Sequence, residues 1–173
     1  MRNAYPDKPL VPYKQTTVQM ALVIKSIAAL LVPVEIKRAL YVFFRIESAN
    51  GHSGVNNNYF GIQADSGRWQ TEYDALISGV CKKAENGTGK ERLFCTFRTY
   101  EDCLKMMASR FKGRGLYVGG TTHKIVQMTI KTPTDLAVAY KREWVKGRAD
   151  YQPTKEEITN FLSMYHQAES LFV

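Results

Sequence analysis

Apolar positions recur at helical spacing over two consecutive stretches near the start of the chain. The first runs from about residue 17 to residue 32, and the second begins after Pro33 and runs from Val34 to Ser48. Apolar residues that return every three or four positions are typical of helices with one buried face. Proline is also well tolerated in the first turn of a helix. The two stretches therefore predict a helical hairpin that forms part of the core.

Turn-forming residues divide the rest of the chain into shorter elements. A β-hairpin is expected over about residues 77–98, because a strong turn signal at Asn86-Gly87 is followed by an aromatic, β-compatible segment, residues 92–98. Further helices are each expected to start at a threonine that can cap the first turn. These threonines are Thr99, Thr134 and Thr154.

Residues 1–16 differ from the rest of the chain, since they contain three prolines and little periodicity. We expect them to form an extended arm on the surface. A single domain is expected over residues 17–173, which is long enough to bury a core without metal or disulfide staples. Mainly helical content with one small β element predicts an α+β fold.

Composition and charge indicate a folded protein with a polyanionic partner. The chain is 45% hydrophobic, and its 24 basic and 16 acidic residues give a formal net charge of +8. Such a balance suits nucleic acid, anionic lipid or bacterial cell wall. The cysteines Cys81, Cys95 and Cys103 and the three histidines lack the spacing of a zinc site. We therefore expect reduced thiols and no metal or cofactor, with a Cys81–Cys95 bridge as the open alternative.

The chain shows no convincing membrane or export segment. Its most apolar run, residues 18–34, is interrupted by Gln19, Lys25, Ser26 and Pro33, whereas a spanning helix needs about 20 consecutive apolar residues. The first residues do not lead into the apolar core of a signal peptide. We therefore expect a protein made without an export signal of its own.

One carboxylate lies on the apolar side of the second predicted helix. At about 100° per residue, Glu47 shares an arc with Leu40 and Phe43, whereas Arg38 and Arg45 fall on the opposite side. Apolar surroundings favour the protonated form of a carboxyl group, and a general acid must carry a proton. Glu47 is therefore a candidate general acid. The alternative is a solvated residue in a frayed last turn.

Four segments, taken in order, resemble a known family. They are the helix ending in Glu47-Ser48, the run Asn57-Asn58-Tyr59-Phe60-Gly61-Ile62-Gln63, the segment Phe97-Arg98-Thr99-Tyr100, and residues 139–151 before the last helix. Together they resemble the glucosaminidase family of the lysozyme superfamily, which includes the flagellar peptidoglycan hydrolase and bacterial autolysins. The second and third segments are similar to the family's Asn-Leu-Phe-Gly-Ile-Lys and Phe-Arg-x-Tyr motifs. The resemblance covers about residues 34–165.

The resemblance implies a mainly helical, lysozyme-like domain with a small β-hairpin lobe. It also implies a glycosidase that cleaves the GlcNAc/MurNAc strand of bacterial peptidoglycan, with Glu47 as the general acid. By the same resemblance, Tyr59, Phe60 and Gln63 line the cleft, although packing is the better supported role for Phe60. Trp69 lies in a polar turn and is a further candidate for stacking on sugar rings. Tyr117, in a glycine-rich turn, is another.

The second carboxylate that glycosidases commonly use is not matched by the motifs. The position at which the family carries it falls on Lys83. The remaining candidates are the acidic residues of the neighbouring turns and hairpin, which are Glu85, Glu72, Asp74 and Asp65. If none of them faces Glu47, a mechanism with a single carboxylate remains.

Three alternatives to a hydrolase remain open. Lytic transglycosylases also combine Glu-Ser with a Gly-Leu-Met-Gln motif, which Gly61-Ile62-Gln63 echoes, and they release 1,6-anhydro products. The hairpin also interleaves basic residues with Phe94 and Phe97, a pattern that suits single-stranded nucleic acid. A third hypothesis is a protein that binds wall glycan without cutting it.

The partners that we expect are peptidoglycan strands and anionic cell-wall polymers. Small size, positive charge and the absence of an export signal suggest a bacteriophage endolysin, and we expect a monomer. Such a bacteriolytic protein is made in the host cytoplasm and released to the cell wall or periplasm, or is carried in the virion.

Overall fold

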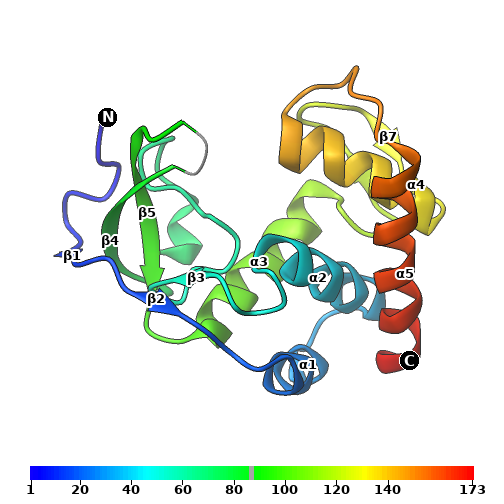
Figure 1. The fold of residues 1–173 in the computed structure, drawn as a ribbon, viewed down its shortest axis with the longest axis horizontal. Coiled ribbons are helices and arrows are strands. Elements are labelled where there is room, and N and C mark those ends of the chain that lie inside the picture. The colour runs from blue at the N-terminus through cyan, green and yellow to red at the C-terminus, as the bar shows by residue number, and fades with distance from the viewer. Residues whose placement is uncertain (86–87) are drawn as a thin grey trace. The chain divides into compact units, whose positions relative to one another are not determined.

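The computed structural model describes residues 1–85 and 88–173 and divides the chain into two compact units (Figure 1). Unit 1 consists of residues 1–23 and 44–106, and unit 2 consists of residues 24–43 and 107–173. The mainly helical α+β class predicted from the sequence is confirmed. The predicted turn residues Asn86-Gly87 lie outside the described residues.

Several helices begin in one unit and end in the other. They are α1 (Met20–Ala29), α2 (Val34–Glu47) and α3 (Tyr100–Arg114). The second predicted helix therefore agrees with α2 to within one residue. The first is shorter than predicted at both ends. At its start, the amide of Val18 donates to the carbonyl of Gly51 at 2.9 Å rather than joining the helix, and at its end Leu31 is fully exposed.

Unit 1 is built on a three-stranded sheet in the order β1-β4-β5. β4 (Ile77–Ala84) and β5 (Glu91–Phe97) form the predicted antiparallel hairpin. β1 (Leu10–Val11) pairs in parallel with β4 and lies beside it in Figure 1. A second, smaller sheet pairs β2 (Gln15–Thr16) with β3 (Gly54–Val55). The first sixteen residues therefore supply strands to both sheets.

The side chain of Tyr5 anchors the start of the chain in unit 1. It is fully buried, and its hydroxyl accepts a hydrogen bond from the amide of Trp69 at 2.9 Å. The guanidinium of Arg68 lies 4.5 Å from the centre of the Tyr5 ring. Arg68 also forms ion pairs with Asp7 at 2.6 Å and Asp74 at 3.0 Å. The arm is thus held by packing, hydrogen bonding and charge together.

The cysteines are buried, free thiols, as predicted. In the hairpin, Cys95 lies opposite Val80, whereas Cys81 lies opposite Phe94. Successive residues of a strand point to opposite faces, so Cys81 and Cys95 lie on different faces of the sheet. The alternative of a Cys81–Cys95 bridge is therefore wrong. Burial raises the pKa of both Cys95 and Cys103 to about 12.

Unit 2 is helical apart from a short pairing of β6 (Thr121–Thr122) with β7 (Met128–Thr129). Helix α4 (Pro133–Ala139) continues directly into the π-helical segment η2 (Tyr140–Lys146), and α5 (Lys155–Leu171) follows. The core contains a cluster of aromatic rings on these elements and on the parts of α2 and α3 in this unit. Its members are Phe43, Phe111, Tyr140, Phe161 and Tyr165.

Threonine caps open the later helices. Thr99 and Thr154 cap α3 and α5 as predicted. The predicted cap at Thr134 is wrong, because the hydroxyl of Thr132 accepts from the amide of Asp135, and the Asp135 carboxylate accepts from the amide of Thr132. This reciprocal pair satisfies two amides that the first turn leaves unbonded. None of the helices in the described parts of the chain is both long enough and apolar enough to cross a membrane.

Candidate active site

Helix α2 ends at Glu47, and the next residue closes the helix. Ser48 is fully buried. Its hydroxyl donates to the carbonyl of Phe44 and accepts from the amide of Gly51 at 2.8 Å. Gly51 has a φ of +85°, and a Cβ at this position would lie 2.2 Å from the carbonyl oxygen of Val18. The chain therefore reverses directly after Glu47, which fixes the last turn of the helix.

Glu47 lines a pocket of about 260 Å³ within unit 1. The walls come from the end of α2, from the loop that contains the Asn-Asn-Tyr-Phe-Gly-Ile-Gln run, and from the hairpin. The lining residues are Glu47, Ser53, Val55, Asn58, Tyr59, Gly61, Gln63, Lys83, Glu85 and Phe94. Segments that the sequence singled out separately thus meet at one cavity.

The side chain of Asn58 organises the loop beside Glu47. It is 3% exposed, and its Nδ2 donates to the carbonyls of Ile62 and Cys95, both at 2.9 Å. Its Oδ1 accepts from the amides of Phe60 at 3.3 Å and Ile62 at 3.1 Å. One amide group therefore closes the turn around Gly61, where φ is +63°, and ties that turn to β5. An asparagine shortly before a glycine is a turn signal, but the sequence does not reveal this role.

Tyr59 and Phe60, both expected in the cleft, are almost completely buried at 1% and 3% exposure. Their rings pack against Phe44, with centroids 5.2 and 5.7 Å away. The hydroxyl of Tyr59 hydrogen-bonds with the side chain of Thr16, and burial raises the pKa of Tyr59. Tyr59 still lines the pocket, whereas Phe60 is not among the lining residues. The packing role expected for Phe60 agrees with this arrangement.

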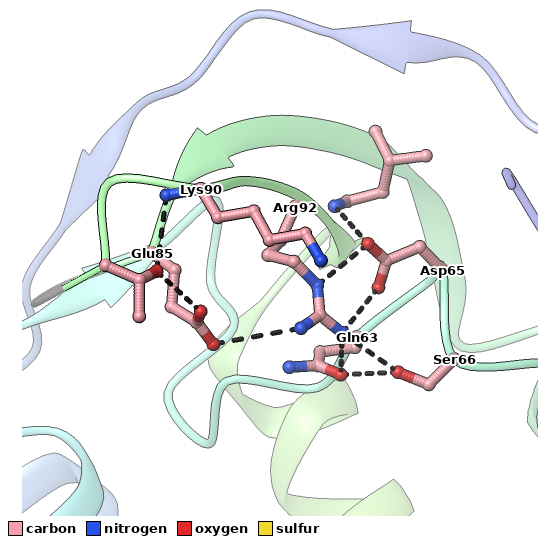
Figure 2. A network of polar contacts seen from close by, with 8 residues as sticks. Gln63, Asp65, Ser66, Glu85, Lys90 and Arg92 are labelled. Carbon is pink, nitrogen blue, oxygen red and sulfur yellow. Dashed lines mark hydrogen bonds and ion pairs between the residues drawn. The ribbon is translucent and has the colours of Figure 1, made fainter. Parts of the chain in front are cut away.

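The hairpin brings two charged side chains to the pocket. Lys83 lies in β4, and Glu85 follows the end of that strand. The backbone of Glu85 is fixed by a hydrogen bond from its amide to the carbonyl of Lys90 at 2.8 Å. Its carboxylate accepts from the hydroxyl of Thr88 at 2.9 Å and lies 3.8 Å from Nη1 of Arg92 (Figure 2). Glu85 thus has a defined position at the pocket.

Arg92 lies at the centre of the polar network in Figure 2. Its Nε donates to Asp65 Oδ2 at 2.9 Å, and its Nη2 donates to Asp65 Oδ1 at 3.2 Å and to Gln63 Oε1 at 2.7 Å. The Asp65 side chain is 4% exposed. Burial acts to raise the pKa of Asp65, but the hydrogen bonds from Arg92 and from the Leu93 amide outweigh it and lower that pKa. Asp65 is thus an ionised partner of Arg92.

Of the four candidates for the second carboxylate, all of which are described, Glu85 is the one that lines the pocket. Asp65 is paired with Arg92, and Asp74 is paired with Arg68. Glu72 is exposed on the short helix η1 (Thr71–Tyr73) and does not line the pocket.

The two aromatic residues expected to stack on sugars are also outside the pocket lining. Trp69 is half-buried, and its indole Nε1 donates to the carbonyl of Gln63 at 2.8 Å. It therefore supports the backbone of a pocket residue. Tyr117 belongs to unit 2. Over residues 1–85 and 88–173, no group of three or more His, Cys, Asp or Glu residues is arranged to hold a metal ion.

Comparisons with known proteins give little to identify this chain. No protein-family model matches it, and no curated protein matches it. Among solved structures, it is similar to the crystal structure of a peptidoglycan hydrolase mutant from Sphingomonas sp. A1. The two chains are 16% identical, the match covers 88% of this chain and 91% of that chain, and the TM-score is 0.44. A match at this level does not assign an activity to this protein.

Proposed function

We propose that this protein cleaves the glycan strands of bacterial peptidoglycan, with Glu47 as the general acid and Glu85 as the second carboxylate. One observation carries the proposal. The pocket at the end of α2 is lined jointly by Glu47, by Gln63 of the family-like run and by Glu85 of the hairpin. The end of α2 and the run that contains Gln63 are among the segments in which the sequence resembles the peptidoglycan-cleaving glucosaminidases, and the hairpin adds Glu85.

Two carboxyl groups at one pocket suit the chemistry of glycoside cleavage. One protonated carboxyl group donates to the leaving oxygen, and a second carboxylate activates water or attacks the anomeric carbon. Glu47 is half-buried at the end of a helix whose preceding apolar positions, Leu40 and Phe43, are fully buried. Glu85 is ion-paired with Arg92, and the carboxylate is the form that a base or nucleophile requires. In this proposal Glu47 is the acid, and Glu85 is the base or nucleophile.

The charge of the whole chain supports the same substrate. A net charge of +8 attracts anionic wall polymers and concentrates the protein at the cell wall. Lys83 adds a positive charge within the pocket lining itself.

The test is digestion of purified sacculi by the wild type, Glu47→Gln and Glu85→Gln, with mass spectrometry of the released fragments. Glu72→Gln is the matched control, because Glu72 is an exposed glutamate outside the pocket lining. We expect Glu47→Gln to release fragments at least 100-fold more slowly, the lower range for loss of a general acid, and Glu72→Gln to match the wild type. The proposal fails if the wild type releases nothing from several wall types, or if Glu47→Gln keeps full activity.

The ends of the released fragments separate the hydrolase from the transglycosylase. Reducing ends together with loss of activity in Glu85→Gln support hydrolysis with two carboxylates. Products with 1,6-anhydro ends and an unimpaired Glu85→Gln variant support the route with a single carboxylate instead. The position of the new reducing end then identifies the bond that is cut.

A further inference from the structure

The amide of Gln63 is held in one orientation. Its Oε1 accepts hydrogen bonds from Nη2 of Arg92, at 2.7 Å, and from the hydroxyl of Ser66. Arginine carries donors and no acceptor, so the Gln63 atom that faces Arg92 must be the carbonyl oxygen and not the NH₂ group. The Nε2 of Gln63 makes no hydrogen bond within residues 1–85 and 88–173. Gln63 is one of the residues that line the Glu47 pocket, and in Figure 2 its NH₂ group points away from Ser66.

The guanidinium of Arg92 is itself held in place, and this stabilises the orientation of the Gln63 amide. Its planar guanidinium contacts both oxygens of Asp65 (Figure 2), and the Arg92 side chain is 22% exposed. The hydrogen bond from Arg92 to Asp65 raises the pKa of the guanidinium further. Asp65 also accepts from the amide of Leu93 at 3.3 Å. Asp65 is therefore attached to β5 at two successive residues, through the side chain of Arg92 and through the amide of Leu93.

The register of the hairpin explains why Arg92 needs Asp65. Lys83 lies directly opposite Arg92 in the hairpin, and like charges at such paired positions repel each other. Asp65 lies in the segment that follows Gln63, and it draws Arg92 toward Gln63 and neutralises its charge. The same guanidinium then reaches Glu85 through Nη1 at 3.8 Å. One arginine thus contacts side chains of two segments that line the pocket.

We propose that Arg92, held by Asp65, is the positioning residue of the Glu47 pocket. It orients Gln63 so that the pocket offers an NH₂ donor, and it holds the Glu85 carboxylate at the pocket wall. The pocket then selects an acceptor oxygen of the sugar, a hydroxyl or carbonyl, at the Gln63 position. This inference rests on the proposed function for the identity of the substrate, but the orientation of Gln63 does not depend on it.

The variants Arg92→Gln, Arg92→Lys and Gln63→Glu test this role. Arg68→Gln is the matched control, since Arg68 also pairs with two carboxylates of unit 1, Asp7 and Asp74, but is not in the pocket lining. Misplacing groups at a catalytic site costs about 100-fold in rate. We therefore expect Arg92→Gln to lower kcat about 10- to 100-fold on soluble glycan fragments, while Arg68→Gln stays within about 2-fold of the wild type.

The other two variants separate positioning from charge. Arg92→Lys keeps the positive charge but replaces the planar guanidinium, which can bind two oxygens side by side, with a single ammonium group. It should therefore recover less than half of the kcat that Arg92→Gln loses. Gln63→Glu keeps the acceptor for Arg92 but removes the NH₂ donor, and should raise KM for the glycan several-fold with little change in melting temperature. If Arg92→Gln and Arg68→Gln lower kcat equally, the positioning role is refuted.

A measurement that does not depend on activity tests the positioning role of Arg92 separately from the proposed function. The side-chain NH₂ signals of Gln63 in a ¹⁵N-labelled sample should shift in Arg92→Gln and Asp65→Asn and stay in place in Arg68→Gln. If the wild type releases nothing from sacculi, the proposed function fails, and these signals still decide the orientation of Gln63. Unchanged Gln63 signals in Arg92→Gln refute the positioning role, whatever the activity.

Discussion

Replacing Asn58 with alanine removes the group that closes the loop beside Glu47. The wild-type side chain makes four hydrogen bonds to backbone groups of Phe60, Ile62 and Cys95. Each is worth about 0.5–1.5 kcal/mol net. Because the four share one side chain and water can enter from the pocket, we expect a loss of about 3 kcal/mol in the free energy of unfolding. For a chain of this length that corresponds to a fall of about 6–12 °C in Tm.

Urea unfolding followed by far-UV circular dichroism and by tryptophan fluorescence measures this loss. Coincident transitions by the two probes are needed before a single free energy is derived. Asn160→Ala is the control, because Asn160 is exposed on α5 and such changes stay within about 0.5 kcal/mol. A loss below about 1 kcal/mol in Asn58→Ala would refute the reasoning, since it would show that water replaces the amide in all four bonds.

Two further predictions concern local geometry and pH. Gly51→Ala should destabilise the protein by more than about 3 kcal/mol, because its Cβ would meet the Val18 carbonyl oxygen at 2.2 Å; a variant of wild-type stability in urea would contradict this. The backbone amide of Thr154 and the side chain of Lys141 lower the pKa of Glu157 from 4.5 to about 2. The folded-state pKa lies below the unfolded one, so this stability is present above pH 4.5 and is lost as pH falls toward 2. Urea midpoints should therefore depend less on pH in Glu157→Gln over that window, and parallel pH profiles would count against the assignment.

The elements that the sequence predicted well are those with local signals. The second predicted helix, the hairpin and the capped last helix correspond to α2, β4–β5 and α5. Apolar periodicity, a turn and a capping threonine are each complete within one short segment. The cap of α4 shows the limit of such signals, since Thr132 and Thr134 are equivalent as residue types. The choice falls to Thr132 because Asp135 lies three residues after it.

The parts of the site that the sequence left open depend on distant pairing. The sequence offers four acidic candidates for the second carboxylate. The structure separates them by the pocket lining and by the arginines that pair with Asp65 and Asp74, and the position of Glu85 depends on the hairpin register. That register includes an irregularity between Ile77 and Gly79, which no local pattern signals. The Arg92–Asp65 pair joins residues 27 positions apart. The place of Glu85 in the pocket lining therefore depends on this distant pairing and cannot be read from composition or spacing.

The interleaving of the two units has a consequence for biosynthesis. Each unit is made of two separate stretches of the chain, and unit 1 needs residues up to 106, whereas unit 2 needs residues up to 173. β1 leaves the ribosome long before its partner β4, since Leu10 pairs with Val80. Pairing across such a separation forms slowly and leaves strand edges uncovered in the meantime. A nascent chain stalled before the hairpin emerges should therefore be a substrate for chaperones, and neither unit can be produced alone as one continuous fragment.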